Sequence, residues 1–205
     1  MQYFLEHFGV GVAAITGVLA ARGKGVDLFG VIVLAVVTAF GGGTLRDVML
    51  GNVPVFWVRD PNFLLTASGV AVVAFFAARF YEIPANVLQV ADAFALALFT
   101  MIGVKKALAL NVSPAIALAM GVITGVVGGI LRDLLAGEIP LVFRPAIYLY
   151  ATAAFCGAVV FLILQRWSLG EHADMIVASS VTLAMRFAAI RWKLGLPVFR
   201  HRAES

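Results

Sequence analysis

The sequence has few charged residues and almost no cysteine. Only 13% of its 205 residues are Asp, Glu, Lys or Arg, whereas 62% are hydrophobic, and a soluble domain of this size needs a more polar surface. Cys156 is the single cysteine, which excludes a disulfide within the chain and is typical of a small buried hydrophobic residue. The composition therefore predicts an integral membrane protein.

The sequence also lacks the residue patterns of an enzyme or a nucleic-acid-binding protein. His7, His172 and His201 are far apart, and no Cys/His cluster has the spacing of a tightly bound metal site. The net charge of +4 comes from Lys and Arg between and after apolar stretches rather than along one face, which is typical of topology determinants. We therefore predict no enzymatic activity, no cofactor, no tightly bound metal, no nucleic-acid partner and no protein partner other than further copies of the chain.

Seven apolar segments are long enough, or nearly so, to cross a bilayer, whose hydrocarbon core requires roughly 20 helical residues. Arg22 and Lys24 follow the first apolar run instead of leading it, so this run is interpreted as a spanning helix and not as a signal peptide. The links are short and carry Gly, Pro and Asn. The chain is therefore predicted to be one all-α transmembrane domain over residues 1–205. The predicted spans are approximately 4–21, 28–50, 63–80, 87–110, 114–135, 145–164 and 173–190.

The chain contains an internal repeat. At an offset of 86 residues, positions 42–54 align with positions 128–140, and seven of these 13 positions are identical. The same offset pairs Glu6 with Asp92 and Thr38 with Thr124. Because each repeat has three spans, the second copy must cross the membrane in the opposite direction to the first. We predict repeat 1 at about 1–84, repeat 2 at about 85–170, and a seventh helix with a cytoplasmic tail at about 171–205.

The distribution of positive charge predicts the orientation. With Arg46 and Arg132 left aside, nine Lys and Arg residues lie near the helix ends on one predicted side and four on the other. Cytoplasmic loops carry the excess of Lys and Arg. The N-terminus is therefore expected outside and the C-terminus in the cytoplasm.

Glycines interrupt two of the predicted helices. Each glycine inside a helix costs up to about 1 kcal/mol relative to alanine, and Thr44 with Asp47 has the pattern of a capping box that restarts a helix. We therefore predict that the second and fifth spans are broken at these glycines. The second break is preceded by Val127 where the first copy has a third glycine. The glycines are Gly41, Gly42 and Gly43 in the first copy and Gly128 and Gly129 in the second.

Broken helices inside a membrane indicate a pathway, because unwound backbone at membrane depth is tolerated only where it is buried in protein or lines a wet cavity. Free carbonyls at such a break suit a cation, and free amides suit an anionic group. The alternative is that the glycines only let two helices pack closely, as small residues do in membranes.

Each glycine motif is followed by an arginine and an aspartate. In a pseudo-two-fold arrangement Arg46 can reach Asp133 and Arg132 can reach Asp47, and such crossed pairs neutralise charges that are costly near lipid. We predict these crossed pairs. They are either a structural latch or direct contacts with the transported species, and the two interpretations have equal support from the sequence.

The fourth span carries two adjacent lysines near its end. Lys105 and Lys106 either extend to the external interface, or one of them projects into the bundle and gates a cation path. Asp92 and Glu6, each near the start of a span, are predicted to be interfacial charges. Arg186, near the end of the last span, is predicted to extend to the cytoplasmic interface.

Residues 41–51 and 53–57, with their echo in repeat 2, resemble the prokaryotic trimeric intracellular cation channel (TRIC) family. The resemblance implies a homotrimer among membrane lipids in a bacterial or archaeal inner membrane. It further implies one pore per protomer, lined by the second and fifth helices and selective for monovalent cations, chiefly K⁺ with Na⁺ possible. In that family a basic residue of the fourth helix is linked to voltage gating, which matches Lys105 or Lys106.

The same bacterial group is also described as glycine transporters. A zwitterionic amino acid would use both ends of a broken helix, with amides for its carboxylate and carbonyls for its ammonium group. The residues alone fit this alternative as well as a channel.

Overall fold

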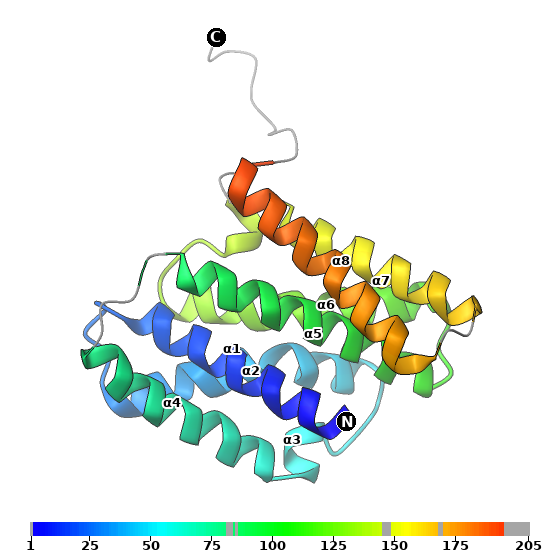
Figure 1. Cartoon of the computed structure of the whole chain (residues 1–205). Helices are drawn as coiled ribbons and strands as arrows, with labels where there is room; N and C mark the ends of the chain where they lie inside the picture. The colour runs from blue at the N-terminus through cyan, green and yellow to red at the C-terminus, as the bar shows by residue number, and fades with distance from the viewer. Residues whose placement is uncertain (1, 81–83, 85, 145–148, 168–169, 195–205) are drawn as a thin grey trace, which may run out of the picture.

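The computed structural model describes residues 2–80, 84, 86–144, 149–167 and 170–194, and these residues form an all-helical bundle (Figure 1). Among them, seven helices are long and apolar enough to cross a membrane. A four-residue helix α3 and a 3-10 helix η1 follow the second and fifth long helices. The bounds are α1 Gln2–Ala21, α2 Leu28–Met49, α3 Phe56–Arg59, α4 Asn62–Phe80, α5 Val87–Ala109, α6 Pro114–Leu135, η1 Leu141–Phe143, α7 Tyr150–Trp167 and α8 Glu171–Trp192.

The predicted class, an all-α membrane protein with seven spans, is confirmed. The helix limits agree with the predicted segments to within a few residues, except that α7 begins at Tyr150. Residues 145–148, at the predicted start of this span, lie outside the described part of the chain. Residues such as Asp27 and Ser113 cap helices locally, because their side chains accept the backbone N–H of Gly30 and Ile116.

The two halves of the bundle are built in the same way. Helix α1 packs on α2 and α4, and α5 packs on α6 and α7, while α8 lies against α5 and α7 (Figure 1). Within each half a glycine lets two helices touch at their backbones. A Cβ on Gly17 would lie 2.6 Å from the Ala35 Cα, and a Cβ on Gly103 would lie 2.9 Å from the Gly121 Cα. These two contacts are related by the offset of 86 residues.

Helices α1 and α5 run in opposite directions (Figure 1). The start of α1 meets the end of α5, since Lys105 Nζ donates to Gln2 Oε1 at 2.6 Å and Lys106 Nζ lies 2.8 Å from Glu6 Oε2. Opposite directions for equivalent helices are what an inverted repeat requires.

The predicted helix breaks are wrong. Helix α2 is continuous through Gly41, Gly42 and Gly43, and α6 is continuous through Gly128 and Gly129. Nor does Thr44 restart a helix, since its hydroxyl oxygen accepts the Trp57 indole N–H at 3.0 Å.

The glycines instead serve the crossing of α2 and α6. A Cβ on Gly42 would collide with the Thr124 carbonyl oxygen, and a Cβ on Gly128 would collide with the Thr38 carbonyl oxygen. The two helices therefore meet backbone to backbone. Close packing, the alternative interpretation of the glycine motifs, is the one that this arrangement supports.

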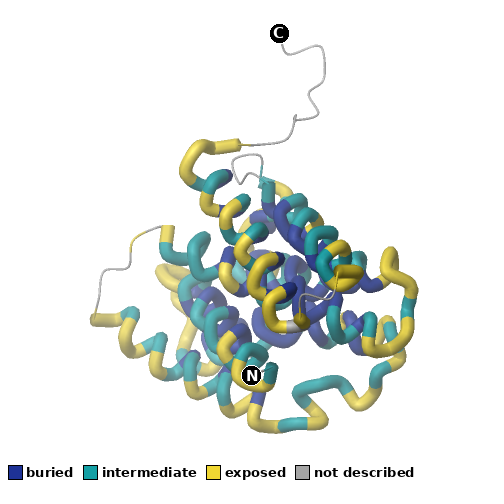
Figure 2. Tube along the Cα trace, turned by 45° about the vertical axis from the view of Figure 1, so that its right-hand side comes forward, coloured by how far each residue is buried: buried dark blue, intermediate teal, exposed yellow. Residues whose placement is uncertain are grey.

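Buried residues occupy the centre of the bundle and exposed residues its outside (Figure 2). The outside of a membrane-spanning bundle is apolar, and many large hydrophobic side chains are exposed here. Among the described residues, the largest fully buried side chains include Arg46, Arg132 and Arg186. Buried charge is costly unless it is paired, so the surroundings of these arginines are the candidate functional region.

Candidate functional site

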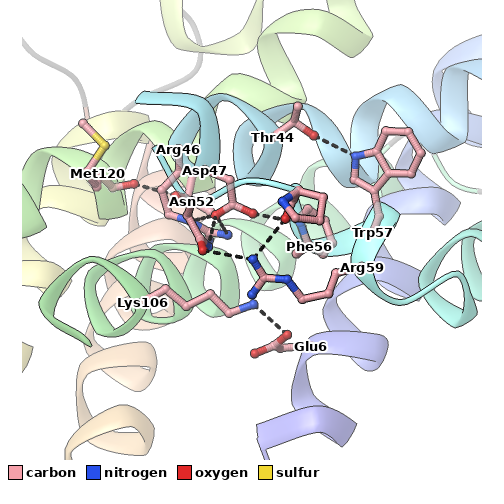
Figure 3. Close-up of polar contacts among 12 residues, drawn as sticks. Glu6, Thr44, Arg46, Asp47, Asn52, Phe56, Trp57, Arg59, Lys106 and Met120 are labelled. Atoms are coloured by element: carbon pink, nitrogen blue, oxygen red, sulfur yellow. Dashed lines mark hydrogen bonds and ion pairs between the residues drawn. The ribbon is translucent and has the colours of Figure 1, made fainter. Parts of the chain in front are cut away.

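The first charged cluster forms where α2 ends (Figure 3). The guanidinium of Arg46 donates from Nε and Nη2 to Asp47 Oδ1, at 2.9 and 2.7 Å. The other oxygen of Asp47 accepts the backbone N–H of Phe56 at 2.9 Å, at the start of α3. Both side chains are buried, with 2% and 1% of their surface exposed. The pair thus joins the end of α2 to the segment that returns over it.

Repeat 2 has the same arrangement at the end of α6. Arg132 Nε donates to Asp133 Oδ1 at 2.8 Å, and Asp133 Oδ2 accepts the backbone N–H of Leu141 at 2.8 Å. In both repeats a glycine with positive φ, Gly51 or Gly137, turns the chain back after the helix.

The predicted crossed pairs, Arg46 with Asp133 and Arg132 with Asp47, are therefore wrong. Each arginine bends back onto the aspartate that follows it, and each repeat neutralises its own charges. In each repeat a backbone N–H donates to Oδ2 of the aspartate. This hydrogen bond orients the carboxylate so that Oδ1 faces the arginine of the same repeat. A sequence argument based on helix periodicity alone misses this, since adjacent residues point away from each other on an ideal helix.

The two clusters differ in their third partner. In repeat 2, Arg132 Nη1 also donates to Asp92 Oδ1 at 2.7 Å. Asp92 is only 3% exposed, so the prediction that it is an interfacial charge is wrong. Its counterpart in repeat 1, Glu6, pairs with Lys106 instead. In the sequence, Asp92 aligns with Glu6 at the repeat offset of 86 residues. This alignment was the one sequence feature that could have identified Asp92 as a partner of Arg132.

Helix α8 covers the repeat 2 cluster. The Arg186 guanidinium lies 4.7 Å from the centre of the Tyr150 ring, and Arg186 has no exposed surface, so the prediction that it reaches the cytoplasmic interface is wrong. A Cβ on Gly129 would lie 2.9 Å from the Tyr150 hydroxyl and 3.4 Å from Asp92 Oδ1. Gly129 therefore leaves the space in which these groups converge.

The repeat 1 cluster lies beside a small cavity of about 20 Å³. Its lining includes the charged groups of Glu6, Arg46 and Lys106, together with Phe56 and Thr124. Lys106 lies over the Phe56 ring, 5.5 Å from its centre. The volume is enough for about one water molecule. This end of the bundle therefore holds charges of both signs around an open space.

The two candidate gating lysines occupy different places. Lys106 lines the cavity, with 24% of its side chain exposed, and pairs with Glu6. Lys105 donates to Gln2 at the start of α1 and is not among the residues that line this cavity. The structure therefore separates two residues that the sequence left equivalent.

The two clusters lie at opposite ends of the bundle. The repeat 1 cluster is at the end of α2 and the start of α1, and the repeat 2 cluster is at the end of α6 and the start of α5. Between them, α2 and α6 cross at Gly42 and Gly128. Among the described residues, no group of three or more His, Cys, Asp and Glu side chains could hold a metal ion.

A family model of known proteins matches the chain in two segments, one in each repeat. The family model described as "Glycine transporter" matches residues 3–79 and 89–166. The two matches begin 86 residues apart (89 − 3), which is the offset of the internal repeat. The chain belongs to the glycine transporter family.

Relatives of this glycine transporter family member are similar over nearly their whole length. The UPF0126 inner membrane protein YadS of Escherichia coli (strain K12) is 46% identical over 201 residues, which is 97% of this chain and 96% of the relative. The UPF0126 membrane protein YvgT of Bacillus subtilis (strain 168) is 32% identical over 96% of each chain. The charged clusters therefore lie within the region shared with the relatives.

Two solved structures have the same fold. A TRIC trimeric intracellular cation channel orthologue from Rhodobacter sphaeroides is 39% identical, with a TM-score of 0.89, over 94% of this chain and 98% of the other. A second TRIC cation channel is 32% identical, with a TM-score of 0.86, over 97% of each chain. The resemblance of this glycine transporter family member to TRIC channels is thereby confirmed, and the chain is a membrane protein and not an enzyme.

Proposed function

We propose that the chain is a monovalent cation channel that conducts chiefly K⁺, with Na⁺ as a second permeant ion, through one pore in each protomer of a homotrimer. The observation that carries the proposal is the likeness to TRIC cation channels over nearly the whole chain, at TM-scores of 0.86 and 0.89. The buried threonines of α2 and α6, Thr38 and Thr124, support it.

The centre of the proposed pore suits a cation. Thr38 Oγ1 donates to the Leu34 carbonyl and Thr124 Oγ1 donates to the Met120 carbonyl, both at 2.6 Å. A hydroxyl that has given its only hydrogen to its own helix offers only lone pairs to a neighbour. Oxygen lone pairs coordinate a cation and disfavour an anion.

The proposed pore would be closed at the helix crossing, since α2 and α6 touch at Gly42 and Gly128. Conduction in the proposed mechanism requires α2 and α6 to separate there. It also requires the buried ion pair of Arg132 and Asp92, at the other end of the proposed path, to move out of that path. Lys106, which lines the repeat 1 cavity, is the proposed voltage-sensing group. A charge that moves through the membrane field exchanges about 2.3 kcal/mol per 100 mV, which is enough for one lysine to bias a gate.

The proposed location is the bacterial or archaeal inner membrane, with the N-terminus outside and the C-terminus in the cytoplasm. The positive-charge count supports this orientation, and one relative is an inner membrane protein of Escherichia coli. In this orientation the cavity beside Lys106 lies toward the outside, and the cluster covered by Arg186 lies toward the cytoplasm.

The proposal is tested by recording purified protein in a planar bilayer with K⁺ on one side and Na⁺ on the other. We expect stepwise currents whose reversal potential follows the K⁺ gradient. Unitary currents carried by anions would contradict cation selectivity, and their absence from folded, correctly assembled protein would contradict a channel.

A second candidate, a transporter of a small zwitterionic amino acid such as glycine, has support from the description of the family model. In this structure the repeat 1 cavity has room for about one water molecule, so glycine would require it to widen. Arg46 and Lys106 would then fit a carboxylate and Glu6 an ammonium group. Uptake of radiolabelled glycine into proteoliposomes distinguishes the two functions. Saturable uptake without unitary current would establish the transporter, and unitary current without glycine uptake would exclude it.

A further inference from the structure

A chain of polar contacts joins the start of α1 to the end of α5. Lys105 Nζ donates to Gln2 Oε1 at 2.6 Å, and Gln2 Nε2 donates to Glu6 Oε1 at 2.8 Å. The other oxygen of Glu6, Oε2, lies 2.8 Å from Lys106 Nζ (Figure 3). Four side chains thus form one continuous set of contacts, which we name the α1–α5 network.

Gln2 is the centre of this network because both sides of its amide are used. The amide oxygen accepts from Lys105, and the amide NH2 group donates to Glu6. Among side chains of this length, only an amide both accepts and donates in this way. A carboxylate at position 2 would still accept from Lys105, but it could not donate to Glu6.

The bond from Gln2 fixes the carboxylate of Glu6. Each oxygen of Glu6 has a separate donor, Gln2 for Oε1 and Lys106 for Oε2. Hydrogen bonds to an ionised carboxylate are stronger than neutral ones, and only 12% of the Glu6 side chain is exposed. Lys106 therefore meets a carboxylate held in one orientation, at the place where its ammonium group lies 5.5 Å from the centre of the Phe56 ring.

The equivalent positions at the other end of the bundle are apolar. At the offset of 86 residues, the counterparts of Gln2 and of the two lysines are Leu88, Leu19 and Ala20. Asp92, the counterpart of Glu6, is held by Arg132. The fold of a repeat therefore does not require the network, and these polar residues belong to the end of the bundle that has the repeat 1 cavity.

We propose that Gln2 is a positioning residue, which holds Glu6 as the counter-ion of Lys106 and thereby keeps the Lys106 ammonium group beside the repeat 1 cavity. Without the bond from Gln2, the Glu6 carboxylate is free to turn, and Lys106 leaves its place more often. The consequence for gating rests on the proposed channel function, whereas the positioning itself does not.

A double-mutant cycle in melting temperature tests the positioning. Gln2→Met keeps the length of the side chain and removes its amide, and circular dichroism checks that the half-buried position tolerates the change. We expect the melting temperature to fall by about 1–4 °C. The fall should be clearly smaller in a Lys106→Met background, because Glu6 then has no ammonium group to hold, and it should persist in a Lys105→Gln background.

A purely structural contact between α1 and α5 predicts a different result. Gln2→Met would then lower the melting temperature by the same amount with and without Lys106, and this outcome would overturn the proposal. Gln89→Met, the same change at a half-buried glutamine near the start of α5, is the matched control and should show no coupling to Lys106.

Gln2→Glu tests the bond to Glu6 separately from the contact with Lys105. It keeps an acceptor for Lys105, loses the donor for Glu6 and adds a negative charge one turn away from it. We expect a fall in melting temperature at least as large as that of Gln2→Met. A melting temperature equal to that of the parent would show that the donated hydrogen bond has no effect and would overturn the proposal.

Single-channel recording tests the consequence for gating. Gln2→Met should raise the open probability by about two- to fivefold, less than the loss of Lys106 itself, and should have no further effect in Lys106→Gln. An unchanged open probability in Gln2→Met would overturn a role in gating. If no variant conducts while the melting temperatures still show coupling between Gln2 and Lys106, the channel function is contradicted and the positioning of Lys106 is supported.

Discussion

Arg132 and Asp92 form a buried ion pair, 2.7 Å from Nη1 to Oδ1, across 40 positions of sequence. Their counterparts in the first repeat, Arg46 and Glu6, both line a cavity in which Glu6 pairs with Lys106. Two equivalent sites thus adopt two arrangements in one molecule: in repeat 2 the arginine pairs with the acidic residue, and in repeat 1 a lysine pairs with it.

The Arg132 pair should contribute strongly to stability. In Asp92→Asn, Arg132 keeps Asp133 but loses a charged partner inside the bundle, and removal of one member of a buried ion pair costs about 3–5 kcal/mol. Glu6→Gln is the matched control, since its partner Lys106 is 24% exposed and a partly exposed pair contributes about 1 kcal/mol or less. Thermal unfolding in detergent should show a much larger fall in melting temperature for Asp92→Asn. Equal falls would contradict the assignment.

The glycines of the α2 and α6 crossing should not tolerate even a methyl group. Gly42→Ala and Gly128→Ala each place a Cβ against a backbone carbonyl of the facing helix, and such overpacking costs about 1–3 kcal/mol or more. Gly69→Ala, where the new Cβ meets open space, is the control and should be neutral or slightly stabilising. The melting temperatures of the three variants check this. If the helices were broken at these glycines, all three changes would be tolerated.

The sequence predicted the long elements because apolar length and the 86-residue repeat are properties of the chain itself. It failed at Gly42 and Gly128 because the local cost of glycine in a helix is smaller than the gain from close contact between helices, and only the facing backbone reveals that contact. It failed at Asp92 and Arg186 for a related reason. A charge near a helix end can point to the interface or into the bundle, and this depends on whether an adjacent helix covers it, as α8 does here.

Acid should weaken the contact between the α1–α2 turn and the loop after α6. The hydrogen bond and charge of Lys24, followed by the charge of Arg144, hold the pKa of Glu138 below its ordinary value. A carboxyl group with a lowered folded-state pKa contributes stability that is present above its unfolded pKa and is lost as the pH falls through its folded pKa. The loss is therefore expected below about pH 4.

Glu138→Gln should remove this part of the acid dependence, since glutamine does not titrate. Melting temperatures of parent and variant between neutral and acid pH check the effect, with Lys24→Gln as a second test because it removes the largest cause of the shift. The difference between parent and Glu138→Gln should be greatest at neutral pH and should vanish in acid. A constant difference at all pH values would contradict the assignment.

The orientation is tested by cysteine labelling from one side of the membrane. In a Cys156→Ala background, a cysteine at exposed Pro61, in the turn between α3 and α4, should react with a membrane-impermeant maleimide in intact cells. A cysteine at exposed Ile139, in the loop after α6, should react only after the cells are opened. The opposite pattern would reverse the predicted topology without altering the fold.

Lys106 and Lys105 provide the sharpest test of gating, because they are adjacent in sequence and differ in position. Lys106 lines the cavity and pairs with Glu6, whereas Lys105 contacts Gln2. If Lys106 obstructs a cation path, Lys106→Gln should raise the open probability by up to about tenfold, which corresponds to about 1.4 kcal/mol, and should flatten its dependence on voltage. Lys105→Gln should leave both nearly unchanged. Single-channel recording at both polarities measures the two quantities, and equal responses of the two variants would show that the positive charge at this end acts diffusely, without a gate at Lys106.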